Sequence, residues 1–435
     1  MHQLRHVRRF REAGRGLPAP GHGDGERMRE HGEIDHWLLA AVIVLAVLGA
    51  AMNLGLSGSA SAAVQSDDGL FFFKRVIIRL AVAALVMMAA MKVNYRRLRK
   101  LAIPGLVLTA GLLAAALAMH ATRGAKSWIF GLQPSEPARL ALVIFLAHYM
   151  DRQRDKMGSL VKGFLVPAMP IVAVSGLIIL QPDFGSAMAV AVIGGTMLFL
   201  GGARLLHLGT GLAAAAAGLA AVVLAKPHVI GRIQGFYLGL TRPDLLQELA
   251  AGASGHLRNT MVHTHQALVA VGSGGIFGVG LGQSKQKLMF ISEPHTDFVF
   301  SIIAEEGGLL AAGGVLLVFL FIMWRGLRIA GQLPDSFDRF AALGLTLSLF
   351  VYSAINIMVN LGLFPITGLP LPFLSYGGSA LAVNAASVGL ILNISRHRGE
   401  KSIDSFTRKR YESNHSRWRD GRASLPRAGG GRRPR

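Results

Sequence analysis

The chain has 435 residues, of which 52% are hydrophobic, and it contains no cysteine. Its mean hydropathy is +0.45 and its formal net charge is +21. So much apolar sequence would require a very large core in a soluble protein. The absence of cysteine excludes disulfides, thiolate metal sites and thiol nucleophiles.

The apolar residues arrive in blocks of about 20, the length that crosses a hydrocarbon slab about 30 Å thick as a helix. A helix satisfies its own backbone hydrogen bonds, which lipid cannot do. The sequence therefore predicts an all-α polytopic membrane protein with about ten transmembrane helices. In chain order the predicted spans are 37–56, 74–93, 101–120, 138–150, 164–181, 184–202, 208–225, 298–323, 340–361 and 379–396.

Basic residues concentrate in the two tails, 1–36 and 397–435, and in short loops such as 96–100 and 152–156. With ten alternating spans, these segments all fall on one side of the membrane. An excess of Lys and Arg marks the cytoplasmic side, so both termini are predicted to be cytoplasmic. The tails are predicted to be disordered, with the membrane domain at 37–396. No aromatic or glycine motif interleaves the basic residues, which argues against nucleic acid as a partner.

The opposite side carries one large extracytoplasmic loop, 226–297, between spans 7 and 8. Its first part, 227–260, is polar and predicted to hold short helices. Its second part, 263–287, is apolar but contains six glycines in eleven residues, which exclude a stable straight helix. A flexible linker is one interpretation, but the intervening aliphatic residues favour packing against the membrane domain. A second glycine- and proline-rich segment, 362–380, is predicted to be non-helical and to line a cavity.

Ionisable residues within spans are functional candidates by default. Arg79, Arg139, Glu305 and Glu306 are of this kind. For the two glutamates the structural interpretation is a buried ion pair or interhelical hydrogen bonds, with one pairing to a basic residue of another span. Asp297 differs because it lies at the mouth of a span, where it is either a helix N-cap or a polar group at the rim of an outer cavity.

His295 is a weak candidate for a metal ligand, because no second histidine or acid stands at ligand spacing. The residues alone lead to a ten-span protein with a polar outer cavity. Such a protein is either a transporter or an enzyme that acts on a lipid-linked substrate.

Five ordered motifs carry a resemblance that extends over residues 37–397. They are 127-SWIFGLQPSEPARLA-141, 181-QPDFGSA-187, 268-LVAVGSGGIFGVGLGQSKQK-287, 293-EPHTDFVFSIIAEEGG-308 and 365-PITGLPLPFLSYGGSALAVN-384. Through them the chain resembles the SEDS family (shape, elongation, division and sporulation), more closely its FtsW, or division, branch than its RodA branch. One departure is 263-HTHQA-267, where His263 and Ala267 replace residues of the family pattern Q-x-x-Q-S.

The resemblance implies a peptidoglycan glycosyltransferase that polymerises lipid II. It makes Asp297 the catalytic residue, a general base that takes the proton of the attacking hydroxyl in an inverting displacement. The pyrophosphate leaving group requires positive charge, from basic side chains (Arg232 among them) or from a divalent cation, Mg or Mn; no organic cofactor is implied. The candidate substrate-binding residues are Lys287, Ser284, His295, Thr296, Arg123, Lys126, Gln133, Glu136, Gln181, Asp183, Ser375 and Tyr376.

The implied partners are lipid II, a class B penicillin-binding protein with transpeptidase activity, and proteins of the divisome or elongasome. The implied location is the bacterial inner membrane. Three alternatives remain at this point: a RodA-like elongation polymerase, a lipid II flippase, and a scaffold for the transpeptidase.

Overall fold

The computed structural model describes residues 33–57, 71–93, 95–119, 132–225, 227–242, 245–253, 255–286, 297–375 and 377–397. The helices of the bundle in this part are α2 (His36–Ser57), α4 (Phe71–Lys92), α5 (Tyr95–Met119), α6 (Ser135–Arg152), α7 (Val166–Leu180), α8 (Phe184–Leu200), α9 (Leu205–Ala225), α13 (Val299–Gln332), α14 (Ser336–Asn360) and α15 (Gly378–Ser395). Between α9 and α13 lie α10 (Pro227–Thr241), α11 (Leu246–Gly252) and α12 (Gly255–Ser273).

These ten helices coincide with the ten predicted spans, and the prediction of an all-α polytopic protein is confirmed. Among the residues that the structure describes, six helices are long and apolar enough to cross a membrane, and α8 and α9 provide two shorter apolar helices. The remaining two, α4 and α6, carry charged residues such as Arg79 and Arg139, which lower their hydropathy. These charges occupy protein interior or cavity wall, where a span tolerates them.

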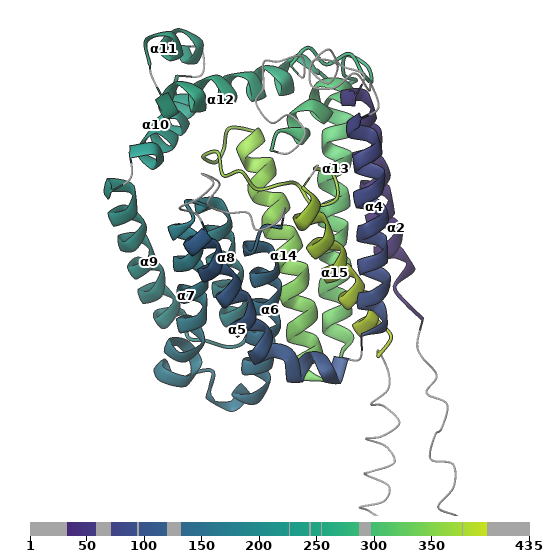
Figure 1. Ribbon diagram of the computed structural model, residues 1–435, viewed down its shortest axis with the longest axis vertical. Helices are drawn as coiled ribbons and strands as arrows, with labels where there is room; N and C mark the ends of the chain where they lie inside the picture. Colours follow the sequence, from purple (N-terminus) through teal and green to yellow (C-terminus); the bar gives the residue numbers. More distant parts are fainter. Residues whose placement is uncertain are drawn as a thin grey trace, which may run out of the picture.

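Helix α14 is the central element of the bundle, because it packs against α13, α15, α6 and α8. Helices α2, α4, α13, α14 and α15 form one half of the bundle, and α5 to α9 form the other (Figure 1). Although α14 is buried along most of its length, it carries several polar side chains, among them Asn356 and Asn360. A buried polar group needs a hydrogen-bond partner, so these side chains mark where α14 holds other segments.

One end of the bundle gathers the start of α2 and the ends of α4, α13 and α15. The backbone nitrogen of Asp35 donates to Ser395 Oγ at 3.3 Å, and Asn393 donates to the carbonyl oxygen of Ala90 at 3.2 Å. Arg325 forms two hydrogen bonds with the Asp35 carboxylate, at 3.1 and 2.6 Å. The first and last long helices therefore have their outer termini at the same end, which we call the basic end.

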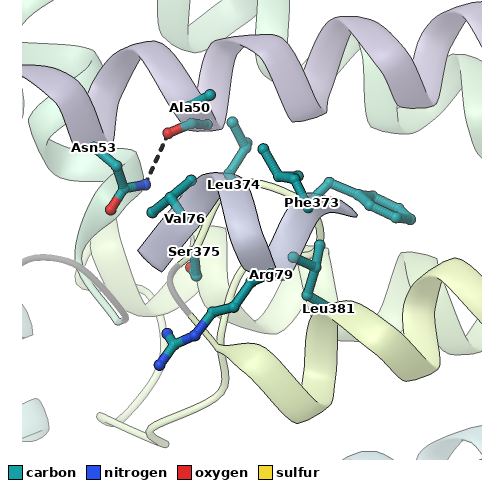
Figure 2. Close-up of a pocket in the computed structure, with 10 residues that line it drawn as sticks. Ala50, Asn53, Val76, Arg79, Phe373, Leu374, Ser375 and Leu381 are labelled. Carbon is teal, nitrogen blue, oxygen red and sulfur yellow. Dashed lines mark hydrogen bonds between the residues drawn. The ribbon is translucent and has the colours of Figure 1, made fainter. Parts of the chain in front are cut away.

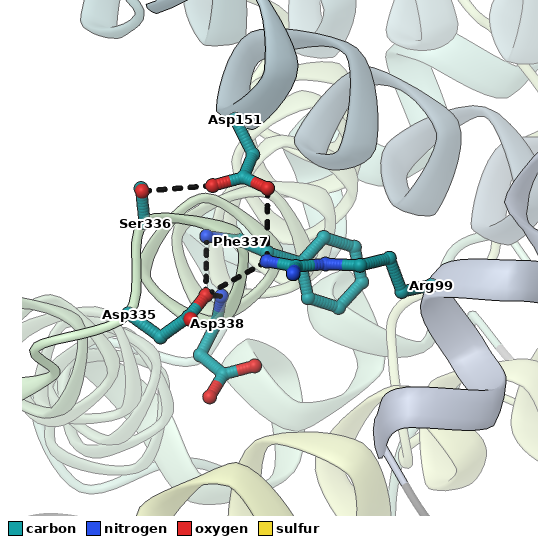
Figure 3. Close-up of polar contacts among 6 residues, drawn as sticks. All are labelled: Arg99, Asp151, Asp335, Ser336, Phe337 and Asp338. Carbon is teal, nitrogen blue, oxygen red and sulfur yellow. Dashed lines mark hydrogen bonds and ion pairs between the residues drawn. The ribbon is translucent and has the colours of Figure 1, made fainter.

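A second group of charges at the basic end joins α5, α6 and α14 (Figure 3). Arg99 Nη2 lies 2.8 Å from Asp151 Oδ2 and 3.0 Å from Asp335 Oδ1. Its guanidinium also stacks over the Phe337 ring, 4.9 Å from the centroid. Asp335 is the N-cap of α14, and Ser336 donates to Asp151 at 2.8 Å. One arginine thus pairs with a carboxylate of α6 and with the N-cap carboxylate of α14.

The loop predicted at 226–297 proves largely helical in its described part, and α10, α11 and α12 lie beyond the end of the bundle opposite the basic end (Figure 1). The short helices predicted within 227–260 are confirmed. For 263–287 the prediction of non-helical backbone was wrong up to Ser273, where α12 ends. The glycines begin at residue 272, and the residues of 263–271 include neither glycine nor proline, so they continue the helix.

Replacing Arg99 by Met is expected to lower the thermal stability of the detergent-solubilised protein. The change removes the one guanidinium between Asp151 and Asp335 and leaves two carboxylates facing each other. Because all three groups are partly exposed, the loss should be about 1 kcal/mol, or a few degrees in Tm. The matched control is Arg97→Met, an exposed arginine on the same helix. Equal midpoints for the two variants would contradict this role of Arg99.

Candidate functional site

The segment between α14 and α15 forms one wall of the site and is non-helical in its described residues. Leu369, Leu371 and Leu374 are buried, which places this backbone inside the bundle. Ser375 Oγ accepts a hydrogen bond from the Leu371 nitrogen at 2.8 Å. Phe373, Leu374 and Ser375 also line a cavity. The prediction of non-helical, cavity-lining backbone at 362–380 is thereby confirmed for residues 362–375, but it was wrong at its end, because α15 begins at Gly378. We refer to residues 361–375 as the wall segment.

Asp297 lies in a turn directly before α13, half-buried, and is not the N-cap of that helix. The N-cap position belongs to Phe298, whose side chain makes no capping hydrogen bond. The carbonyl oxygen of Asp297 accepts hydrogen bonds from Asn356 at 3.0 Å and from Asn360 at 2.9 Å. A Cβ at Gly368, where φ is +76°, would lie 3.7 Å from Asp297 Oδ2. The carboxylate therefore faces the wall segment at a residue that only glycine occupies without strain.

The second Gln-Pro motif reaches the same wall segment from the other side. A Cβ at Gly185, in the first turn of α8, would lie 2.5 Å from the carbonyl oxygen of Thr367. Thr367 and Gly368 are consecutive, so α8 and Asp297 contact neighbouring residues of one segment. Two of the predicted site motifs, separated by more than a hundred residues, are thus brought together.

Asp183 is the N-cap of α8 and accepts from the Ser186 nitrogen at 3.1 Å and from Gln133 Nε2 at 2.8 Å. Burial raises the pKa of Asp183, while the hydrogen bonds from Ser186 and Gln133 and the charge of Arg232 oppose that rise. Gln133 and Asp183 come from the two Gln-Pro motifs, 133-QPSE-136 and 181-QPD-183. Their side chains therefore join the starts of α6 and α8.

Glu136 and Arg139 form a fully buried ion pair one turn apart on α6, with Nη2 of Arg139 2.7 Å from Oε2 of Glu136. The same Nη2 atom donates to Asn384 Oδ1 of α15 at 2.8 Å. The Arg139 guanidinium lies over the Tyr352 ring of α14, 3.8 Å from the centroid. Arg139 thus joins three helices beneath the wall segment. A buried charge of this kind persists only because it is paired and hydrogen-bonded.

Glu305 and Glu306 face the glycine-rich segment that follows α12, where they accept hydrogen bonds from backbone. Glu305 accepts from Ser284 Oγ and, at 3.0 Å, from the Lys285 nitrogen. Their own carbonyl oxygens accept from Val279 and Gly280 at 2.9 and 3.0 Å. Just beyond them α13 bends at Gly308, where φ is +66°. The glycine-rich segment is therefore packed against α13, which confirms packing over the flexible-linker interpretation.

Arg79 lines the cavity between α2, α4 and the wall segment, and Asp297 is not among its lining residues (Figure 2). Asn53 and Ser375 contribute polar groups to the same cavity, and Asn53 Nδ2 donates to the carbonyl oxygen of Gly49 at 2.8 Å. The rest of the wall is apolar. A cationic side chain in this position projects into a cavity within the bundle, as expected for an ionisable residue in a span.

Several predicted substrate contacts prove to be buried structural groups. Gln181 donates to the carbonyl oxygen of Leu113 at 2.8 Å and is 2% exposed. Ser284 is 1% exposed and bound to Glu305. Six further candidates lie outside the described residues: Lys287, His295, Thr296, Arg123, Lys126 and Tyr376.

Sequence reasoning missed Asn356 and Asn360, which donate to the Asp297 carbonyl oxygen, and Ser301, which donates to Asn360. A signal for the first two was present, since polar residues four apart in an apolar span share one helix face. It also missed the contact of His263, whose ring packs against Phe298 with centroids 6.1 Å apart. Burial lowers the pKa of His263, which favours its neutral form beside this phenylalanine.

The described residues contain no group of three or more His, Asp or Glu side chains that could hold a metal ion. Mg²⁺ is commonly held by one or two carboxylates together with substrate phosphates. The predicted divalent cation would therefore find no protein cage in the described part of the chain.

These features define a polytopic helical membrane protein in which the Asp297 carboxylate faces a non-helical wall segment. The chain belongs to the FtsW/RodA/SpoVE family of cell cycle proteins, whose profile matches residues 36–400. It is 35% identical to a probable peptidoglycan glycosyltransferase FtsW of Trichlorobacter lovleyi, over 83% of this chain and 93% of that one. It is 36% identical to the stage V sporulation protein E of Bacillus subtilis, over 83% and 97%.

Solved structures share the fold. One belongs to a study titled "Structural coordination of polymerization and crosslinking by a peptidoglycan synthase complex", with a TM-score of 0.66 and 28% identity over 85% of this chain and 99% of that one. Another is the rod shape determining protein RodA of Thermus thermophilus, with a TM-score of 0.58 and 27% identity over 85% and 98%.

Replacing Arg139 by Met is expected to destabilise the protein by about 3–5 kcal/mol, because it leaves the Glu136 carboxylate buried without its partner. The double variant Glu136→Gln/Arg139→Met should recover part of that loss, since neither charge remains. Thermal unfolding in detergent measures both effects. A double variant less stable than Arg139→Met alone would show that the two side chains do not act as a pair.

Proposed function

We propose that this chain is a peptidoglycan glycosyltransferase that polymerises lipid II into glycan strands for cell division. The names of its curated relatives support the activity, and the similarity to FtsW sequences supports the division role. The observation that carries the site assignment is the placement of Asp297. Its backbone is held by two amides of α14, and its carboxylate faces a non-helical segment at the end of the bundle opposite the basic end.

In the proposed reaction, the 4-hydroxyl of the acceptor N-acetylglucosamine attacks the anomeric carbon of the growing strand's N-acetylmuramic acid. The Asp297 carboxylate takes the hydroxyl proton as the new carbon–oxygen bond forms. The bond between the anomeric carbon and the lipid pyrophosphate breaks, and its electron pair leaves with the pyrophosphate. An α-linked donor gives a β-1,4 product by one displacement, so a single base suffices and no covalent enzyme intermediate forms.

Positive charge must stabilise the departing pyrophosphate. We assign this role to basic side chains at the Asp297 end, of which Lys287, Lys126 and Arg123 are sequence candidates. Arg232, on α10, is a described candidate whose charge already acts on Asp183. A divalent cation would bind chiefly through the pyrophosphate itself, and chelation by EDTA tests whether polymerisation requires one.

The proposed partner is a class B penicillin-binding protein that cross-links the new strands. Support comes from the similarity to the structure whose title names a synthase complex coordinating polymerization and crosslinking. The proposed location is the bacterial inner membrane with the basic end in the cytoplasm, because Lys and Arg accumulate on cytoplasmic loops.

Replacing Asp297 by Asn should lower polymerisation of labelled lipid II by about 10²- to 10⁴-fold, the usual contribution of a general base. Strand products are resolved by gel electrophoresis, with and without the class B partner, which should raise the wild-type rate. Asp155→Asn, an exposed acid at the basic end, is the matched control.

Three results would count against the proposal. Full polymerisation by Asp297→Asn removes the base assignment. Transport of labelled lipid II without polymer by the wild type favours a flippase over an enzyme. A wild-type rate that the class B partner leaves unchanged, with no co-elution of the two proteins, removes the partner.

The cysteine-free chain allows a direct test of the orientation. Gln283→Cys places a thiol on the exposed glycine-rich segment, and Asp155→Cys places one at the basic end. In intact spheroplasts a membrane-impermeant maleimide should label the first variant, and should label the second only after permeabilisation. The reverse pattern would overturn the orientation.

A further inference from the structure

Two asparagines of α14 converge on the backbone of Asp297 from one helix face. Asn356 and Asn360 are four residues apart and are 2% and 0% exposed. Each directs its amide nitrogen to the carbonyl oxygen of Asp297, at 3.0 and 2.9 Å. This oxygen thus accepts two hydrogen bonds, the full capacity of its lone pairs. The backbone at Asp297 is therefore held from outside its own segment.

The side-chain oxygen of Asn360 caps the N-terminus of α13, which has no capping side chain of its own. The first N–H groups of a helix need acceptors, and an N-cap side chain normally provides one to the third helical residue. Here the N-cap is Phe298, which cannot do so. Asn360 Oδ1 accepts instead from the Ser301 nitrogen at 3.0 Å and from Ser301 Oγ at 2.7 Å. Helix α13 is capped from α14.

Asn356 extends the same network to the wall segment. Its amide nitrogen also donates to the carbonyl oxygen of Leu369 at 2.7 Å. Leu369 follows Gly368, the residue that the Asp297 carboxylate faces. One side chain therefore fixes both the backbone that carries the carboxylate and the backbone opposite it. Asn356 thus sets the spacing of the two backbone segments, and Asn360 adds a second hydrogen bond to the Asp297 carbonyl oxygen.

We infer that Asn356 and Asn360 are positioning residues for Asp297, holding its carboxylate at a constant distance from the wall segment. The inference rests on the proposed role of Asp297 as the base. A general base must lie within hydrogen-bond reach of the proton it removes. A misplacement of 1 Å at a reacting group costs about 10²-fold in rate. Buried side chains locked by several hydrogen bonds provide such placement, whereas a flexible loop does not.

The chain offers a matched control for the loss of these bonds. Asn393 of α15 also donates its amide nitrogen to two backbone carbonyl oxygens, those of Ala90 and Val93, and is 7% exposed. It lies at the basic end, away from Asp297. Asn356→Leu and Asn393→Leu therefore each remove one hydrogen bond from two carbonyl oxygens, although the Asp297 oxygen keeps its second bond, from Asn360. A merely structural role predicts similar consequences for both variants.

The test compares steady-state polymerisation of lipid II by the full-length variants, below the unfolding temperature of each. Asn356→Leu should lower kcat by about 10- to 100-fold with KM within about twofold, because positioning of the base acts on the chemical step. Asn393→Leu should leave both constants near wild type even where its Tm falls. Ser301→Ala removes one hydrogen bond to Asn360 and keeps the one from the Ser301 nitrogen. It should lower kcat by a few-fold and is informative if Asn356→Leu does not fold.

A double-mutant cycle separates this inference from the proposed function. In the Asp297→Ala background, Asn356→Leu should cause no further loss of residual activity, since there is no carboxylate left to position. Equal kcat for Asn356→Leu, Ser301→Ala and Asn393→Leu would overturn the positioning role while leaving Asp297 as the base. Full activity of Asp297→Ala would overturn the base assignment, whatever the asparagine variants do.

Discussion

Peptide groups that leave helical geometry inside an apolar bundle must find their hydrogen-bond partners within the protein, and this constraint shapes the whole outer end of the molecule. Lipid supplies none, and an unmade bond costs several kcal/mol. Helix α14 provides partners through Asn356 and Asn360, whose amide nitrogens donate hydrogen bonds to the carbonyl oxygens of Leu369 and Asp297. A largely buried helix therefore carries amide side chains at the positions where non-helical backbone needs partners. The site therefore depends on these side-chain hydrogen bonds, which allow non-helical backbone to lie inside the bundle.

The two ends of the bundle are built differently. At the basic end, ion pairs such as Arg325 with Asp35 and Arg99 with Asp151 and Asp335 join the helices. At the opposite end, the contacts run through non-helical segments and a helix bent at Gly308. A carrier that alternates its access must open both ends in turn. An enzyme needs only one end that admits its substrate, and the other end can stay closed. The difference between the ion-paired basic end and the non-helical opposite end agrees with that arrangement.

Most of the fold could be predicted from the sequence, because the length and composition of each apolar block are local properties. Boundaries were less certain where two signals compete. The glycines predicted non-helical backbone for all of 263–287, but the chain is helical up to Ser273. The site was predicted less completely. Gln181 and Ser284 belong to motifs that contain several predicted site residues, yet the side chains of both form hydrogen bonds within the protein. Glu305 and Glu306 hold the backbone of the glycine-rich segment, a role that residue type alone does not indicate.

Local sequence is enough to predict about ten apolar spans, an excess of Lys and Arg in the tails and in alternate short loops, and the position of Asp297 at the mouth of a span. The surroundings of Asp297 follow only from the packing of the helices. Asn356 and Asn360 are 59 and 63 residues away in the chain, and Gly368 belongs to yet another segment. Helical periodicity encodes which residues share a face. Which faces meet depends on the packing of every helix between them, and no local pattern contains that information.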